Sequence, residues 1–181
     1  MTPVLLGIGA NLGDRAAALR AAVSGLGRFL NVTALSPVYE TAPMYVMDQD
    51  RFLNMAVAAE TGMGPDRLLA AVKDLERRLG RTPSRRYGPR QIDIDVIFYG
   101  QEVVAEPGLE IPHPRLPERP FVLAPAADIA PGWVHPETGR TVAQMLDALG
   151  PLRGIEKRGD LDADASSSDA EGGQPLYARA P

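Results

Sequence analysis

Residues 81–100 read RTPSRRYGPRQIDIDVIFYG, an arginine-rich turn region followed by the pattern of a β-strand. The even positions 92, 94, 96 and 98 are apolar, while Asp93 and Asp95 fall on alternate odd positions. A period of two places alternate side chains on opposite faces of a strand. The pattern therefore predicts a central strand over residues 92–99 with both aspartates on one face and the apolar residues, Phe98 included, on the other.

The two aspartates lie two strand steps apart, roughly 6–7 Å along the strand. Aspartate is a poor strand former, and neighbouring carboxylates on one face repel. A divalent cation would compensate for this cost, and Mg²⁺ is bound in proteins by one or two carboxylates together with substrate phosphates. The arginines just upstream are the residue type that forks onto phosphate oxygens. The alternative is a solvated edge strand whose aspartates pair with those arginines, and the two aspartates alone leave both interpretations open.

Length and composition are those of an ordinary soluble domain. The chain has 181 residues, of which 45% are hydrophobic and 23% charged, enough for one domain with a core. The absence of cysteine excludes a disulfide framework and a thiolate metal site. No apolar run approaches the roughly 20 residues of a membrane span, and the N-terminal apolar run has no basic segment before it. We therefore expect no membrane partner, and we interpret the N-terminus as a first strand.

The net charge of −4 is concentrated in the last 23 residues, 159–181, which hold five acids and one base. Their composition has too few apolar residues to offset the entropy of ordering, which predicts a disordered acidic tail without a catalytic role. Residues 1–158 form the predicted single domain, and this body is neutral, which gives no case for binding nucleic acid. Six arginines within residues 77–90 make a local basic patch that suits a small polyanion.

The remaining segments predict an α+β fold. Strands are expected at residues 4–10, 31–39, 52–61 and 92–99, and helices at 15–26 and about 66–79, with Asp14 as the N-cap of the first helix and Pro65 as the first residue of the second. A possible hairpin follows at 100–105, then a stiff proline-rich loop at 111–120 and helices at 121–129 and 141–149. Strand, helix, strand, strand, helix, strand is the βαββαβ order of a ferredoxin-like fold, with a mostly antiparallel sheet covered by helices.

The chain lacks the common phosphate-binding motifs. It has no GxxxxGK[ST] loop and none of the protein-kinase strings. Gly7, Gly9 and Gly13 are spaced GxGxxxG, one residue longer than a dinucleotide fingerprint, and we interpret them as turn and packing positions. A phosphoryl-transfer enzyme of this sequence would have to rely on metal ions and arginines.

Three separate motifs resemble one enzyme family. Residues 86–96 fit R-[WY]-G-P-R-x-x-D-x-D-[IV], residues 112–121 fit PHPRxxxRxF, and residues 41–54 fit T-x-P followed by D-Q-x-x-[FY]-L-N. In this order they resemble the 6-hydroxymethyl-7,8-dihydropterin pyrophosphokinases of folate synthesis. The likeness runs from GIGANLGDR near the N-terminus to about residue 131. It implies a ferredoxin-like enzyme that transfers diphosphate from Mg·ATP to the hydroxymethyl group of the dihydropterin and releases AMP.

The resemblance also implies the site residues. It assigns two Mg²⁺ ions to Asp93 and Asp95, and catalytic roles to these aspartates with Arg81 and Arg90. Pro83 departs from the second arginine that many members carry after Arg81, and Arg85 and Arg86 are the candidates for its replacement. The implied ATP-binding residues are Arg81, Tyr87, Arg90, Val96, His113 and Arg119. The implied pterin-binding residues are Thr41, Pro43, Met44, Phe52, Asn54 and Phe121.

The resemblance further implies a monomer in the cytoplasm whose partners are the small molecules ATP and the hydroxymethyl dihydropterin. Three alternatives compete with this interpretation. A metal-dependent transferase with another acceptor would share the metal site. An RNA-binding module would need exposed aromatic residues on central strands, where this chain has Asp93 and Asp95. A ligand sensor without chemistry leaves the acidic pair beside six arginines unexplained.

Overall fold

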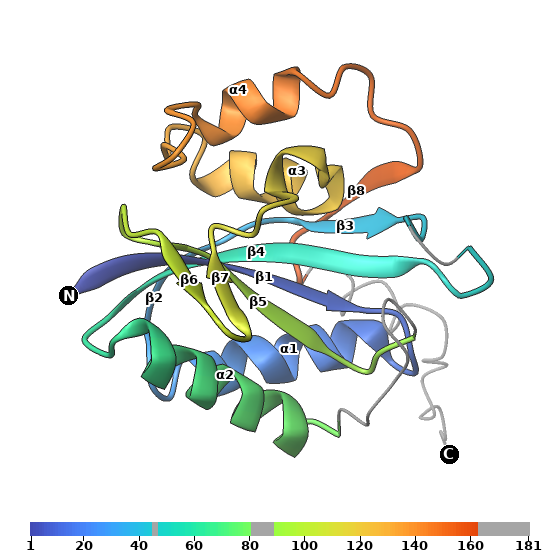
Figure 1. The fold of residues 1–181 in the computed structure, drawn as a ribbon. Helices are drawn as coiled ribbons and strands as arrows, with labels where there is room; N and C mark the ends of the chain where they lie inside the picture. The colour runs from blue at the N-terminus through green and yellow to red at the C-terminus, as the bar shows by residue number, and fades with distance from the viewer. Residues whose placement is uncertain (45–46, 81–88, 163–181) are drawn as a thin grey trace, which may run out of the picture.

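The structure, a computed structural model, describes residues 1–44, 47–80 and 89–162. Its helices and strands are labelled in chain order (Figure 1). They are β1 (Thr2–Ala10), α1 (Arg15–Leu26), β2 (Asn31–Leu35), β3 (Val38–Thr41), β4 (Phe52–Thr61), α2 (Pro65–Arg78), β5 (Asp93–Tyr99), β6 (Val104–Glu106), β7 (Leu109–Ile111), the short 3₁₀ helix η1 (Leu116–Glu118), α3 (Pro120–Ile129), α4 (Val142–Asp147) and β8 (Ile155–Gly159).

The main sheet has the strand order β5-β1-β4-β3-β8, with β2 also pairing with β4, and all its pairs are antiparallel. If β2 and β3 are taken as one interrupted strand, the first six elements follow the predicted βαββαβ order. Helices α1 and α2 cover one face of the sheet, and α3 and α4 cover the other (Figure 1). The predicted α+β, ferredoxin-like fold with a mostly antiparallel sheet is confirmed.

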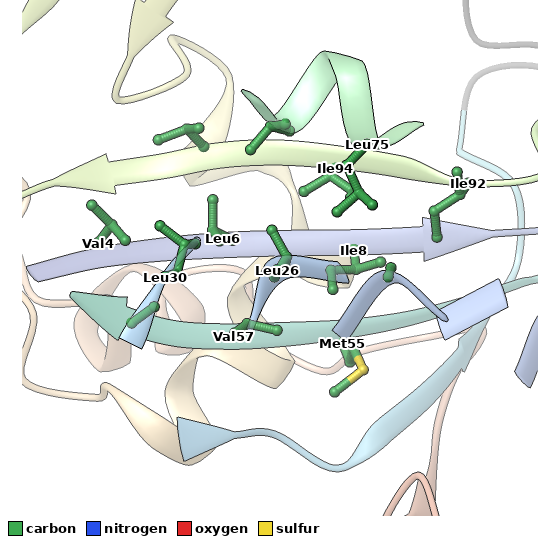
Figure 2. Close-up of a cluster of buried hydrophobic side chains, with 14 of the residues drawn as sticks. Val4, Leu6, Ile8, Leu26, Leu30, Met55, Val57, Leu75, Ile92 and Ile94 are labelled. Atoms are coloured by element: carbon green, nitrogen blue, oxygen red, sulfur yellow. The ribbon is translucent and has the colours of Figure 1, made fainter. Parts of the chain in front are cut away.

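The larger core fills the space between the sheet and the first helix pair. Alternate residues of β1 and β4, such as Leu6 and Val57, meet apolar residues of α1 and α2 there, among them Leu26 and Leu75 (Figure 2). Both helices begin as the sequence predicts. The Asp14 carboxylate accepts a hydrogen bond from the Ala17 amide at 2.9 Å, and Pro65 is the first residue of α2.

The smaller core lies on the opposite face, beneath α3 and α4. Its residues include Leu5, Ala56, Leu123 and Met145. Phe98 stacks on Trp133 with ring centroids 5.6 Å apart, which fastens the end of β5 to the segment before α4. The cavity described below borders this core, since Ile97 and Val122 belong to both.

The prediction of one continuous strand over residues 31–39 is wrong. It breaks at Ser36 and Pro37 into β2 and β3, because proline has no amide hydrogen for a ladder. The predicted hairpin partner of β5 is also corrected, since β6 pairs with β7. The proline-rich loop contains η1 and is not fully extended, and β8 was not predicted at all.

A β-bulge changes the alternation of β5. Leu6 pairs with Val96 but Leu5 pairs with Phe98, so Ile97 is an extra residue opposite β1. Ile97 and Phe98 therefore both belong to the core beneath α3, while Val96 faces α1 and α2. The prediction that Phe98 shares a face with the even-numbered residues is wrong for this reason. β5 is also the edge strand of the main sheet and not a central one.

The folded part of the chain continues past residue 158. Gly159 is the last residue of β8, and Leu161 packs partly buried against the larger core. The disorder predicted for the tail concerns mainly residues 163–181, which lie outside the described residues. Within the described part of the chain, no helix is long and apolar enough to cross a membrane.

Candidate active site

A cavity of about 330 Å³ opens over β1, β4 and β5, beside α3. This volume suits a small ligand. It brings together three groups of side chains that are far apart in the sequence. The lining residues are Gly7, Ile8, Gly9, Thr41, Ala42, Met44, Gln49, Phe52, Asn54, Met55, Lys73, Arg90, Asp93, Asp95, Ile97, His113, Arg119, Phe121 and Val122.

The floor of the cavity depends on two glycines inside β1. A Cβ atom on Gly9 would lie 2.6 Å from Asn54 Oδ1, closer than real side chains pack. Gly7 and Gly9 lie within β1, and because they have no side chains they leave space at the floor of the cavity. Of the three glycines in the motif, Gly13, with φ +62°, is the one in the turn. The interpretation of these three glycines as turn and packing positions is confirmed, with Gly7 and Gly9 as packing positions and Gly13 in the turn.

The acidic pair has the arrangement predicted from its spacing. Asp93 and Asp95 both line the cavity, and Asp93 forms an ion pair with Arg90. Burial, together with the negative charge of Asp93, raises the pKa of Asp95 to about 6, against the opposing effect of nearby cations such as Lys73. The two neighbouring carboxylates repel each other when both are ionised. A bound cation would remove this repulsion and stabilise the pair.

Basic side chains surround this pair. Arg90, Arg119 and Lys73 line the same cavity. Arg119 is only 7% exposed, its guanidinium carbon lies 5.8 Å from the centre of the Phe121 ring, and its Nε has no hydrogen-bond partner among the described residues. A buried guanidinium N–H without an acceptor is costly, so this group is suited to an anionic ligand.

The other end of the cavity suits a flat polar heterocycle. Phe52 and Phe121 supply aromatic surface, and Asn54 supplies an amide. Asn54 is 7% exposed, and its Nδ2 donates to Thr41 Oγ1 at 2.7 Å. That hydrogen bond orients the amide, and the exposed side chain of Met44 lies at the rim.

Asn11 connects the loops on the two sides of the cavity. Its Nδ2 donates to Gln49 Oε1 at 3.0 Å and to the Asp50 carbonyl at 3.1 Å. On the other side its Oδ1 accepts a hydrogen bond from the backbone amide of Arg90 at 2.8 Å, and the backbone amide of Asn11 donates to the Arg90 carbonyl at 3.1 Å. The side chain is 1% exposed, so one buried amide holds both loops at their bases.

The structure brings most of the predicted site residues together. Two do not line the cavity, since Val96 faces the core beneath α1 and α2 and Pro43 is buried beside the site. Arg81 and Tyr87, with the proposed replacements Arg85 and Arg86, lie outside the described residues. The predicted residues that line the cavity are Thr41, Met44, Phe52, Asn54, Arg90, Asp93, Asp95, His113, Arg119 and Phe121.

Sequence reasoning missed several residues of the site. Lys73 lies on α2 beside the apolar stripe, where its charge resembles an ordinary solvated helix face, so the sequence held no signal for it. Asn11 and Gln49 each lie inside a motif of the resemblance, but nothing in the sequence showed that they meet. The Gly9–Asn54 contact could have been suspected from two glycines within a predicted strand.

Comparison with known proteins places this chain in a family. The family model described as 7,8-dihydro-6-hydroxymethylpterin-pyrophosphokinase (HPPK) matches residues 5–131. A 2-amino-4-hydroxy-6-hydroxymethyldihydropteridine pyrophosphokinase of Methylorubrum extorquens is 45% identical over 159 residues, which cover 87% of this chain and 99% of that protein. The mitochondrial folate synthesis bifunctional protein of Pisum sativum is 47% identical over 127 residues, or 70% of this chain.

The chain spans about a quarter of the pea protein's length, 25%, and a similar share of the Arabidopsis thaliana relative, 24%. Among solved structures, a Plasmodium falciparum HPPK-DHPS triple mutant aligns with a TM-score of 0.68 at 16% identity, covering 82% of this chain and 43% of that one. This likeness concerns the fold. With the family match over residues 5–131, the chain belongs to the 7,8-dihydro-6-hydroxymethylpterin-pyrophosphokinase family.

Proposed function

We propose that the chain transfers the diphosphoryl group of ATP to the hydroxymethyl oxygen of 6-hydroxymethyl-7,8-dihydropterin and releases AMP, as a step of folate synthesis. The observation that carries the proposal is the joint lining of one cavity by an acidic pair, basic side chains and an aromatic–amide patch. The first two groups suit a metal-bound polyphosphate, and the third suits a pterin. The family membership supports the same reaction.

In this reaction the hydroxymethyl oxygen forms a bond to the β-phosphorus, and the bond between that phosphorus and the α–β bridging oxygen breaks. Phosphoryl transfer of this kind depends mainly on positioning and charge neutralisation. Arg90 and Arg119 would neutralise phosphate oxygens, and Asn54 with Phe52 and Phe121 would hold the pterin so that its hydroxymethyl group faces the phosphates. All these side chains line one cavity of the size of a small ligand.

We propose that Asp93 and Asp95 hold Mg²⁺ that arrives with ATP, two ions in all. The donor set fits this metal, because hard carboxylate oxygens and phosphates are its preferred ligands. Two carboxylates supply only part of the coordination shell of magnesium, and phosphates of the nucleotide and water would complete it. When bound, magnesium would polarise the phosphates and neutralise the charge that develops on them.

Two further parts of the proposal concern the whole protein. The first is that the protein is a monomer, as the family resemblance implies, and size-exclusion chromatography with light scattering tests this. We also propose that the chain acts in the cytoplasm, and fractionation of cells that express it tests the compartment.

The test of the reaction is the identity of the nucleotide product. Purified protein is mixed with Mg·ATP and the hydroxymethyl dihydropterin, and the nucleotides are separated by chromatography. Release of AMP that depends on the pterin supports the proposal, whereas release of ADP, or no release, contradicts it. Asp95→Ala and Asp93→Ala should each lower turnover by at least about 10³-fold while the far-UV spectrum is kept, and near wild-type turnover of either at saturating Mg²⁺ contradicts the metal assignment.

A further inference from the structure

The free edge of β5 is held by two side chains of helix α2. β5 is the outermost strand of the main sheet, so on one side its backbone groups have no strand to pair with. At Ile94 these groups meet α2. The Ile94 amide donates to Glu76 Oε1 at 2.6 Å, and the Ile94 carbonyl lies 3.4 Å from Lys73 Nζ, which donates to it.

Ile94 is the residue between Asp93 and Asp95. Its amide hydrogen belongs to the peptide plane shared with Asp93, and its carbonyl belongs to the plane shared with Asp95. Because each peptide unit is rigid, fixing these two groups fixes the planes on both sides of Ile94. The hydrogen bonds from α2 therefore restrict the direction in which each carboxylate leaves the strand.

Glu76 is an unusual choice for a residue whose only task is to pack. It is 1% exposed, on a helix whose neighbouring buried residues, Leu68, Val72 and Leu75, are apolar. A buried carboxylate is costly unless it is paired and hydrogen-bonded. Glu76 meets both conditions, because its Oε2 lies 3.1 Å from Lys73 Nζ one turn earlier and its Oε1 accepts the Ile94 amide.

We infer that Glu76, assisted by Lys73, is a positioning residue that aligns Asp93 and Asp95 for a metal-bound nucleotide. The inference rests on the proposed function for the metal role of the two aspartates, and it adds the residue that sets their geometry. Glu76 acts through the backbone of Ile94 and touches neither the metal nor the substrates. What matters in this role is that an acceptor atom reaches the Ile94 amide.

Two conservative variants separate this role from a purely electrostatic one. Glu76→Gln keeps the length and an acceptor oxygen but loses the charge. Glu76→Asp keeps the charge but shortens the side chain by one methylene. Its carboxylate therefore no longer reaches the Ile94 amide, which lies 2.6 Å from Glu76 Oε1 in the wild-type protein. Asp74→Asn is the control, because Asp74 is on the same helix and its carboxylate forms ion pairs with the exposed side chains of Arg77 and Arg78.

Three measurements are made on each variant. Amide hydrogen exchange of Ile94 in the metal-free protein reports the hydrogen bond itself. Electron paramagnetic resonance of Mn²⁺, titrated with a non-hydrolysable ATP analogue, reports metal affinity, and steady-state kinetics give kcat and the KM for the pterin. We expect Glu76→Asp to speed the exchange about tenfold, weaken Mn²⁺ binding about tenfold and lower kcat, with the pterin KM unchanged. Glu76→Gln should stay within about threefold of wild type in all of them, as should Asp74→Asn.

The order of the two Glu76 variants decides the inference. If Glu76→Gln is as defective as Glu76→Asp, or worse, charge and not reach is the operative property and the inference is wrong. It is also wrong if Glu76→Asp exposes the Ile94 amide but leaves Mn²⁺ affinity and kcat unchanged, because the contact then serves stability alone. Failure of the proposed function would look different, since the wild-type protein would release no AMP while the exchange data still report the hydrogen bond.

Discussion

Replacing Gly9 by alanine should disturb the pterin end of the cavity through one contact. The new Cβ would lie 2.6 Å from Asn54 Oδ1, so one of the two groups must move. Asn54 cannot yield freely, because it is 7% exposed and its Nδ2 is bonded to Thr41 Oγ1 at 2.7 Å. Rotation of the amide breaks this bond and leaves buried polar atoms without partners, at a cost of about 1–3 kcal/mol.

The same substitution at Gly7 provides the matched comparison. There a Cβ would lie 3.5 Å from Ile97 Cδ1, an ordinary van der Waals contact. Neither glycine has a positive φ, so alanine in both places should stabilise the folded state by about 0.4–1 kcal/mol by restricting the unfolded chain. Gly7→Ala is therefore expected to be neutral or slightly stabilising, and Gly9→Ala to lie about 2 kcal/mol below it in unfolding free energy.

Urea denaturation followed by the fluorescence of Trp133, the single tryptophan, measures the stability difference. A fluorescence titration with the pterin in the presence of a non-hydrolysable ATP analogue measures binding, which Gly9→Ala should weaken at least about tenfold, the equivalent of one lost hydrogen bond of about 1.4 kcal/mol. The decisive control is Asn54→Ala, in whose background Gly9→Ala should cost nothing further. Equal penalties with and without Asn54 would refute the reasoning.

Three further outcomes follow from the site. In the metal-free protein the pKa of Asp95 is about 6, above its ordinary 3.8, so its contribution to stability is full below pH 4 and is lost as the pH rises through 6. Urea denaturation in EDTA should therefore show an unfolding free energy that falls with rising pH in this range, and the fall should be smaller in Asp95→Asn. Protonation of the same group competes with metal, so Mn²⁺ affinity measured by electron paramagnetic resonance should fall steeply below pH 6, and an affinity constant from pH 5 to 7 would contradict the metal assignment. Asn11→Ala removes three side-chain hydrogen bonds of a buried amide and should lower the unfolding free energy by about 2–4 kcal/mol. Asn31→Ala, at an exposed position, removes one hydrogen bond to Glu60 and should lower the unfolding free energy by less than about 0.5 kcal/mol. Similar losses in both variants would rule out the bridging role of Asn11.

The elements that the sequence predicts well are those with strong local signals. α1 begins after its Asp14 cap, α2 begins at Pro65, and β4 has the predicted bounds, because caps, prolines and alternation are readable over a few residues. β8 has no such signal. Its charged residues pair with β3 at the sheet edge, and only that tertiary contact makes it a strand.

The candidate site divides in the same way. Asp93 and Asp95 were predicted to share a face from their spacing alone, and the motifs indicated Asn54 and Arg119. The hydrogen bonds of Asn11 and the Glu76–Ile94 contact could not be predicted, because each joins segments whose proximity depends on the complete sheet. The edge position of β5 likewise depends on which strands pair, a property that no local pattern encodes.

The bulge at Ile97 gives β5 two independent halves. The carboxylate half keeps strict alternation with β1, and the aromatic half is shifted by one residue, so that Ile97 and Phe98 both meet the layer of α3. Deleting Ile97 would restore a regular strand in which Phe98 directly follows Val96, so Phe98 would keep its partner Leu5 and its place against Trp133, and Asp93 and Asp95 would keep their partners on β1. The extra residue therefore adds one apolar side chain to the core beneath α3 without changing the register of the acidic pair.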